Sequence, residues 1–177
     1  METVRRGNVH VDMKLVPENY NRVKDVNGLI RYIANSEKAT SGLIGGRGVN
    51  PYDADQMCED FSRVRRVHEK AYYKLAKQLI LSVDKNAGVD PEEMLECAKE
   101  VAKAVFPNYQ CVYSVHENDD ANRLHTHIAI NTINYETGLK LDFGIGDFSQ
   151  IRAVADEVIN GEAEKPEEKK INVMDLL

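Results

Sequence analysis

The spacing of apolar side chains along the chain predicts four helices. Residues 23–34 carry apolar side chains at positions 23, 26, 29, 30 and 33, which lie on one face of a helix. Asp53 is a candidate N-cap for a second helix that extends to about Lys74. Asp90 followed by Pro91 opens a third helix that ends near Val105. Residues 148–159 form the fourth.

Strands are predicted where apolar residues alternate with polar ones or form short runs between turn residues. These segments are residues 9–15, 75–83, 109–116 and 125–133, with a short further strand at 139–143. Residues 39–51 contain four glycines and predict a loop. Strands joined by short connections pair antiparallel, so the chain is expected to be an α+β protein: a central antiparallel β-sheet with helices packed on it.

The length of 177 residues predicts a single domain over 1–160, followed by a charged C-terminal tail over 161–177. No apolar run approaches the roughly 18 residues of a membrane span, and the first residues do not resemble a signal peptide. The three cysteines are odd in number and widely spaced, which favours reduced thiols. These features predict a cytoplasmic protein without a membrane span.

The net charge of −6 lies mainly near the C-terminus, where residues 142–177 contain nine acidic and four basic side chains. The preceding part is nearly neutral and contains locally basic stretches. Arg31, Lys38 and Arg47 form one group, and a second lies between Arg63 and Lys74. A locally positive groove is what phosphate binding requires, although the second group is equally compatible with a solvated helix face.

Three of the five histidines fall within twelve positions. His125 and His127 are two residues apart on a predicted strand, so their imidazoles share one face of the sheet. His116 ends the preceding strand and would lie beside them. Three imidazoles that converge in this way form a site for a divalent metal ion, although they could also be buried histidines held by hydrogen bonds. The pattern does not separate a zinc hydrolase from a Mg²⁺ or Mn²⁺ phosphodiester enzyme.

The order of His, a short polar loop, His-x-His, apolar residues and Asn resembles the metal motif of the HUH endonucleases. Within that superfamily, the chain is most similar to plasmid relaxases (mobilisation nucleases) of the MobA/VirD2 type. Residues 29–38 resemble the family segment that carries the nucleophilic tyrosine, and residues 50–54 and 59–61 resemble the segment that follows it. One departure is Gln78, which stands where many relatives have a histidine.

The resemblance implies a relaxase-like catalytic domain that nicks single-stranded DNA at an origin of transfer through a tyrosyl-phosphodiester intermediate. Tyr32 would be the nucleophile, and His116, His125 and His127 would bind a divalent ion, Mg²⁺ or Mn²⁺, with Zn²⁺ as an ion that can occupy the site in crystals. Accessory mobilisation proteins would be further partners. The residues expected to bind DNA are Arg31, Lys38, Arg47 and Asn131. The carboxylates expected to support the histidines are Glu117 and Asp119.

Two other function classes fit the same residues. A His₃-metal hydrolase would use a metal-bound hydroxide and need no tyrosine. A DNA-binding accessory protein of the same fold would lack activity altogether. Tyr52, Tyr72 and Tyr73 are the rivals of Tyr32 as nucleophile.

Overall fold

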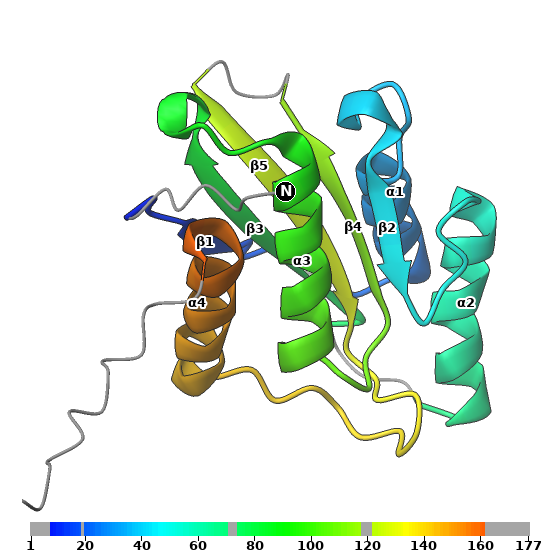
Figure 1. Cartoon of the computed structure of the whole chain (residues 1–177). Coiled ribbons are helices and arrows are strands. Elements are labelled where there is room, and N and C mark those ends of the chain that lie inside the picture. The colour runs from blue at the N-terminus through cyan, green and yellow to red at the C-terminus, as the bar shows by residue number, and fades with distance from the viewer. Residues whose placement is uncertain (1–7, 19, 71–73, 118–121, 162–177) are drawn as a thin grey trace, which may run out of the picture.

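The protein is built around one five-stranded antiparallel sheet with helices on both faces (Figure 1). The computed structural model describes residues 8–18, 20–70, 74–117 and 122–161. The strand order is β1-β3-β5-β4-β2. The strands are β1 (Asp12–Leu15), β2 (Ile44–Arg47), β3 (Ala76–Asp84), β4 (Cys111–His116) and β5 (Arg123–Asn131). The helices are α1 (Val23–Ile33), α2 (Ala54–Val67), α3 (Pro91–Val105) and α4 (Ile145–Asn160), with short 3-10 turns at Thr40–Gly42 and Lys85–Ala87.

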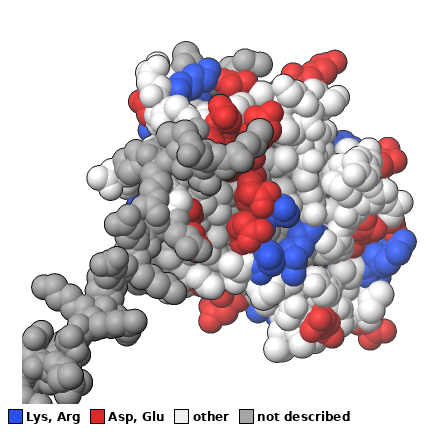
Figure 2. Space-filling model, viewed as in Figure 1, with Lys and Arg blue, Asp and Glu red and all other residues white. Residues whose placement is uncertain are grey.

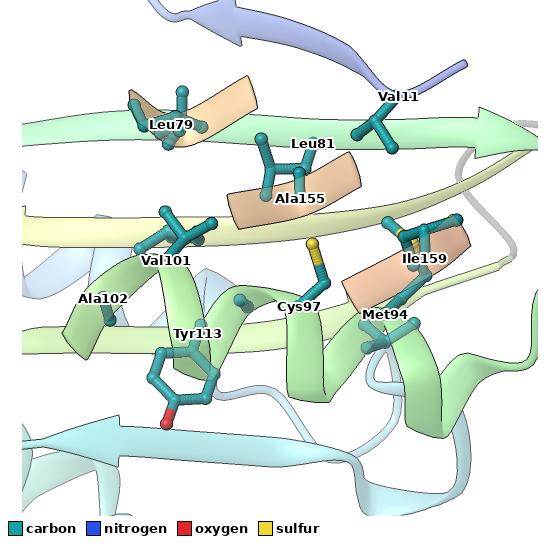
Figure 3. Packing of buried hydrophobic residues seen from close by; sticks show 14 of the residues in the cluster. Val11, Leu79, Leu81, Met94, Cys97, Val101, Ala102, Tyr113, Ala155 and Ile159 are labelled. Atoms are coloured by element: carbon teal, nitrogen blue, oxygen red, sulfur yellow. The ribbon is translucent and has the colours of Figure 1, made fainter. Parts of the chain in front are cut away.

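One face of the sheet packs against α3 and α4 (Figure 3). Leu79 and Leu81 of β3 contribute to this core, and Ile128 and Ile130 of β5 extend it. The helices contribute the fully buried Met94, Cys97, Val101 and Ile151. Because side chains alternate along a strand, the residues between these apolar positions must face the other side of the sheet.

That other face packs against α1 and α2. Ile30 and Ile33 of α1 and Phe61 of α2 cover Val112 of β4 and Ala129 of β5 in a second buried cluster. His125 and His127 share this face with Ala129, since the three alternate along β5. The end of α1 therefore lies over the part of the sheet that carries the histidines.

The predicted fold class is confirmed, with helices covering both faces of the sheet. The expected helix starts at Asp53 and Asp90 are also confirmed. The Asp53 carboxylate accepts hydrogen bonds from the amides of Asp55 and Gln56, and Glu93 accepts from the Asp90 amide. The fourth helix begins three residues earlier than predicted, at Ile145.

Other predicted boundaries were wrong. The second helix ends at Val67 rather than near Lys74, because Glu69 and Lys74 have positive φ angles that a helix cannot accommodate. The segment 139–143 forms a single bridge between Ile133 and Lys140 instead of a strand. The first strand is limited to four residues. Residues 162–177, the greater part of the predicted tail, lie outside the described residues, so the domain boundary stays a prediction.

The glycine-rich loop predicted over 39–51 is in fact the edge strand β2 together with its flanking turns. Gly45 pairs with Tyr113, whose ring lies directly over the glycine. A Cβ atom at this position would lie 2.3 Å from a carbon of that ring. The glycine therefore serves close packing here, which a pattern of turn-forming residues cannot distinguish from a loop.

In the part of the chain that the structure describes, no helix is both long enough and apolar enough to cross a membrane. All three cysteines are buried and unbridged. Burial raises the pKa of Cys97 and that of Cys111 to about 12, so neither thiol supplies an accessible thiolate.

Two glycine substitutions should change the stability of the fold in opposite directions. Gly45→Ala forces the Tyr113 ring to move and should destabilise the protein by about 1–3 kcal/mol, as overpacking does. Gly28→Ala, in the exposed interior of α1 with nothing near the new methyl group, should stabilise it by about 0.5–1 kcal/mol. Urea unfolding of both variants measures the two effects. Equal stability of Gly45→Ala and the parent would contradict the packing role of Gly45.

Candidate active site

The structure brings His116, His125 and His127 together at one end of the sheet. The pairing of β4 with β5 sets His116 opposite His125 and Ser114 opposite His127. The ring centroids of His127 lie 4.6 Å from those of His116 and 4.8 Å from those of His125. All three side chains are buried, with exposed fractions of 0%, 7% and 5% in chain order.

These three residues form a set of metal-ligating atoms that lie within 4.8 Å of one another. Neutral imidazole is the commonest metal ligand among protein side chains and suits several divalent transition ions. Atoms at these separations are candidate ligands of a single ion. The donor set therefore fits a divalent metal ion, and three protein ligands leave coordination positions open to a substrate oxygen.

Hydrogen bonds to β-strand neighbours determine which nitrogen of His116 carries a proton. The Ser114 hydroxyl donates to the carbonyl of Ile33 at 2.6 Å, and its Oγ lies 2.9 Å from Nε2 of His116. Because the hydroxyl has only one proton, Nε2 must donate to Oγ, which leaves the lone pair of His116 on Nδ1. Ser114 thus joins the last turn of α1 to a histidine of the site.

His127 is contacted by Gln78, whose Nε2 lies 2.9 Å from Nδ1 of the imidazole. The histidines were expected to be supported by carboxylates instead. Asp119 lies outside the described residues, and support by Glu117, which follows β4 directly, stays a prediction. The sequence analysis noted Gln78 only as a departure from a family pattern, although a polar residue on the same face as the histidines was a usable signal.

Tyr32 lies in the last turn of α1, and its ring packs against two of the histidines. The ring centroid is 5.5 Å from that of His116 and 5.4 Å from that of His127. A tight turn in which Lys38 and Ala39 donate to the carbonyl of Asn35 follows the helix. This turn brings Lys38 Nζ to 4.5 Å from the Tyr32 ring centroid. The Tyr32 phenol and the Lys38 ammonium therefore lie next to the group of three histidines.

The rival nucleophiles are less well placed. Tyr52 is 94% exposed at the start of α2, and Tyr72 and Tyr73 lie outside the described residues. Tyr113 faces α3, and burial raises its pKa to about 12. Among the described tyrosines, Tyr32 is the one whose ring packs against the histidines.

A groove of about 730 Å³ leads to this site between β1, β3 and α1. Tyr32 and His127 line this groove, together with Lys14, Arg22 and Glu18. Arg22 also pairs with Asp25, whereas Lys14 projects from the exposed side of β1. Sequence reasoning did not single out Lys14 or Arg22, because their position beside the site depends on the pairing of β1 with β3.

The four side chains expected to bind DNA are not all close to the site. Lys38 is adjacent to Tyr32, and Arg31 is exposed and pairs with Asp55 of α2 at 2.8 Å.

Arg47 faces α3 on the opposite side of the sheet, and its guanidinium donates to the carbonyl of Pro107. Asn131 is 3% exposed, and its amide donates to Gln110 and to the carbonyl of Phe61. Arg47 and Asn131 therefore lie away from Tyr32 in this structure, and a role of either residue in DNA binding stays a prediction.

The α3–α4 face, opposite the histidines, carries acidic and basic side chains next to one another (Figure 2). Lys99 and Lys103 of α3 pair with Glu96 and Glu100 on the same helix. This mixture gives no continuous positive surface in that view, so the groove beside Tyr32 is the better candidate for an anionic ligand.

Comparisons with known proteins relate this chain to a family. Two curated Staphylococcus aureus proteins, each named Protein rlx, are 30% and 31% identical to this chain over 118 and 117 residues. Each match covers 66% of this chain but only 35% and 33% of the relative, so the chain spans about a third of their length.

A solved structure described as "Molecular Basis of Vancomycin Resistance Transfer in Staphylococcus aureus" has the same fold, with a TM-score of 0.54. That likeness covers 86% of this chain and 90% of the other, at 14% identity. The family "Relaxase: MobA/VirD2-like, nuclease domain" matches residues 32–161, a range that contains Tyr32 and all three histidines. The chain therefore belongs to the MobA/VirD2-like relaxase family and contains its nuclease domain.

Proposed function

We propose that this protein is a metal-dependent nickase and strand transferase that cleaves single-stranded DNA at an origin of transfer in plasmid or mobile-element mobilisation. The observation that carries the proposal is the packing of the Tyr32 ring against His116 and His127. A nucleophile directly beside a set of metal ligands is the arrangement that phosphodiester transesterification requires. Family membership of residues 32–161 supports the same reaction class.

In the proposed reaction the Tyr32 hydroxyl oxygen attacks the scissile phosphorus. The bond from phosphorus to the 3′ oxygen breaks, the leaving oxygen takes up a proton, and a 5′-phosphotyrosine and a free 3′-OH result. The number of phosphoester bonds is unchanged, so the reverse attack by a 3′-OH can rejoin a strand. An ordinary tyrosine, with a pKa of about 10, is largely protonated at neutral pH, so the site must assist its ionisation.

Lys38 and the histidines would give this assistance. The Lys38 ammonium, 4.5 Å from the Tyr32 ring centroid, is close enough to stabilise the negative charge of a phenolate or of the phosphate that approaches it. His116, His125 and His127 would hold the divalent ion. When bound, that ion supplies Lewis-acid polarisation of a non-bridging phosphate oxygen and offsets charge in the transition state. Mg²⁺ and Mn²⁺ are the proposed ions, with Zn²⁺ able to occupy the same nitrogens.

The groove that Tyr32 and His127 line is the proposed path of the DNA strand. Its walls carry Lys14 and Arg22, and Lys38 lies beside Tyr32, which also lines the groove. A groove that places cations along a single strand binds phosphates in a salt-dependent way without demanding a base sequence. Accessory mobilisation proteins, a cytoplasmic location and a division into a catalytic domain (1–160) and a charged tail (161–177) belong to the same proposal.

Removing one histidine should eliminate metal binding. His125→Ala or His127→Ala should weaken Mn²⁺ binding by more than about 100-fold, because loss of an outer-shell partner alone typically costs 10–100-fold. Isothermal titration calorimetry gives the affinity, and circular dichroism checks the fold. His10→Ala, at an exposed histidine outside the site, is the matched control. Unchanged Mn²⁺ affinity in both site variants would remove the metal centre from the proposal.

Tyr32→Phe should abolish strand transfer and leave metal binding intact. The substitution keeps the ring and its packing on the histidines but removes the attacking oxygen. The measurement is the covalent protein–DNA adduct formed with single-stranded origin DNA and Mn²⁺, resolved by denaturing electrophoresis. Tyr52→Phe, at an exposed tyrosine, should form the adduct normally. Full cleavage by Tyr32→Phe, with no adduct in the parent protein, would favour a His₃-metal hydrolase instead.

Neutralising Lys14 should weaken DNA binding and reduce its dependence on salt. Loss of one phosphate contact to a single strand should lower the slope of log affinity against log salt by about 0.7. Lys14→Gln and the control Lys103→Gln, on α3 at the opposite face, remove the same charge. Fluorescence anisotropy with a single-stranded oligonucleotide over a salt series compares them. Equal slopes for the two variants would exclude the groove as the DNA path.

A further inference from the structure

Three polar side chains form a continuous hydrogen-bonded chain behind His127. Nε2 of Gln78 lies 2.9 Å from Nδ1 of His127, and Oε1 of Gln78 accepts a hydrogen bond from the Tyr20 hydroxyl at 2.7 Å. Oε2 of Glu18 lies 3.1 Å from the same hydroxyl. Gln78 and Tyr20 are buried, with exposed fractions of 6% and 7%, whereas Glu18 is at the surface of the groove. This series of hydrogen bonds therefore connects His127, a buried candidate metal ligand, to the exposed carboxylate of Glu18.

The orientation of the Gln78 amide decides where His127 carries its proton. With Oε1 toward Tyr20, the amide N–H points at Nδ1 of His127, so Nδ1 accepts a hydrogen bond. A neutral imidazole that accepts at Nδ1 carries its proton on Nε2. Neither nitrogen then has a lone pair to offer a metal ion. In this arrangement His127 is protected from metal binding.

A rotation of the Gln78 amide by half a turn exchanges the positions of Oε1 and Nε2. The hydrogen bonds to His127 and Tyr20 are then kept with donor and acceptor reversed. Oε1 then accepts from Nδ1–H of His127, and Nε2 of Gln78 donates to the Tyr20 oxygen. The Tyr20 proton, displaced from Oε1, can donate to Glu18 at the distance already present. The imidazole proton has moved from Nε2 to Nδ1 of the same ring, so no proton is gained or lost. Nε2 of His127 now has the lone pair that a metal ligand needs.

From this geometry we infer that Gln78 is a positioning residue whose amide turns over when the site binds its metal ion, with Tyr20 and Glu18 stabilising the metal-binding orientation. Glu18 makes the turned state possible, because without this acceptor the Tyr20 proton would point at the amide N–H of Gln78. His116 has no such choice, since Ser114 donates to the Ile33 carbonyl and fixes its tautomer. The inference rests on the proposed metal site and deepens it.

The first test measures the tautomer of His127 directly, by ¹⁵N NMR of the imidazole in the full chain. We expect the Nε2–H form in the protein stripped of metal and the Nδ1–H form after addition of Zn²⁺, a diamagnetic probe. This readout does not depend on activity. Because coordination at Nε2 itself places the proton on Nδ1, the tautomer of the metal-free protein is the part of the result that tests the orientation of Gln78. An Nδ1–H form already present without metal would overturn the turn of the amide.

The second test measures Zn²⁺ affinity by calorimetry in variants that keep the fold. Gln78→Met preserves the shape of the side chain but cannot accept from Nδ1–H, and should weaken binding by about 10–100-fold. Glu18→Gln, at an exposed residue, should weaken binding several-fold with an unchanged melting temperature. Glu37→Gln removes the same charge from an exposed loop and should leave affinity unchanged.

The outcomes separate this inference from the proposed function. Wild-type affinity in both Gln78→Met and Glu18→Gln would overturn the positioning role and leave the metal site intact. A parent protein that binds no Zn²⁺ would overturn the metal site and this inference together. Weaker binding in the two variants, with a change of tautomer in the parent, is the result that the structure leads us to expect.

Discussion

The antiparallel register of β4 and β5 is the constraint on which the site depends. It sets His116 opposite His125, and Ser114 opposite His127, on one face of the sheet. A shift of the pairing by one residue would turn each of these side chains toward the α3–α4 core and bring Ile128 or Ile130 into the site. The apolar side chains that pack against α3 and α4 therefore fix the positions of the histidines, although none of them takes part in the chemistry. Burial of apolar side chains against α3 and α4 thus sets the positions of the histidines on the opposite face of the sheet.

Burial of three imidazoles beneath α1 has a cost that hydrogen bonds offset. A buried polar group without a partner would destabilise the fold by about 1–3 kcal/mol. Ser114 and Gln78 supply partners to His116 and His127, and both lie on strands whose alternation places them on the histidine face. The residues that contact the ring nitrogens of His116 and His127 are thus the same residues that offset the cost of burying them. This shared role explains why polar side chains interrupt otherwise apolar strands at these positions.

Much of the fold could be predicted from the sequence, because helix caps and apolar periodicity are local signals. The spacing of His125 and His127 also predicted a shared face. What the sequence could not supply was anything set by pairing between distant strands. From the sequence alone, Gly45 is predicted to lie in a loop, whereas in the structure it packs under the ring of Tyr113. Arg47 is predicted to lie near the site, whereas β2 directs it toward α3. Glu18, Tyr20 and Gln78 come together only because β3 lies beside the segment that leads into α1.

The bond from Ser114 to the carbonyl of Ile33 has a consequence for how the site fails. Ile33 is the residue after Tyr32, the proposed nucleophile. The Ser114 hydroxyl therefore joins the last turn of α1 to His116. If the end of α1 frays, the Ser114 hydroxyl loses its acceptor, the Ile33 carbonyl. The tautomer of His116 is then no longer fixed, and Tyr32 is displaced with the same helix turn. The positions of Tyr32 and His116 are therefore expected to be lost together and recovered together. Under the proposed function, a centre with Tyr32 displaced beside three intact histidines is therefore disfavoured.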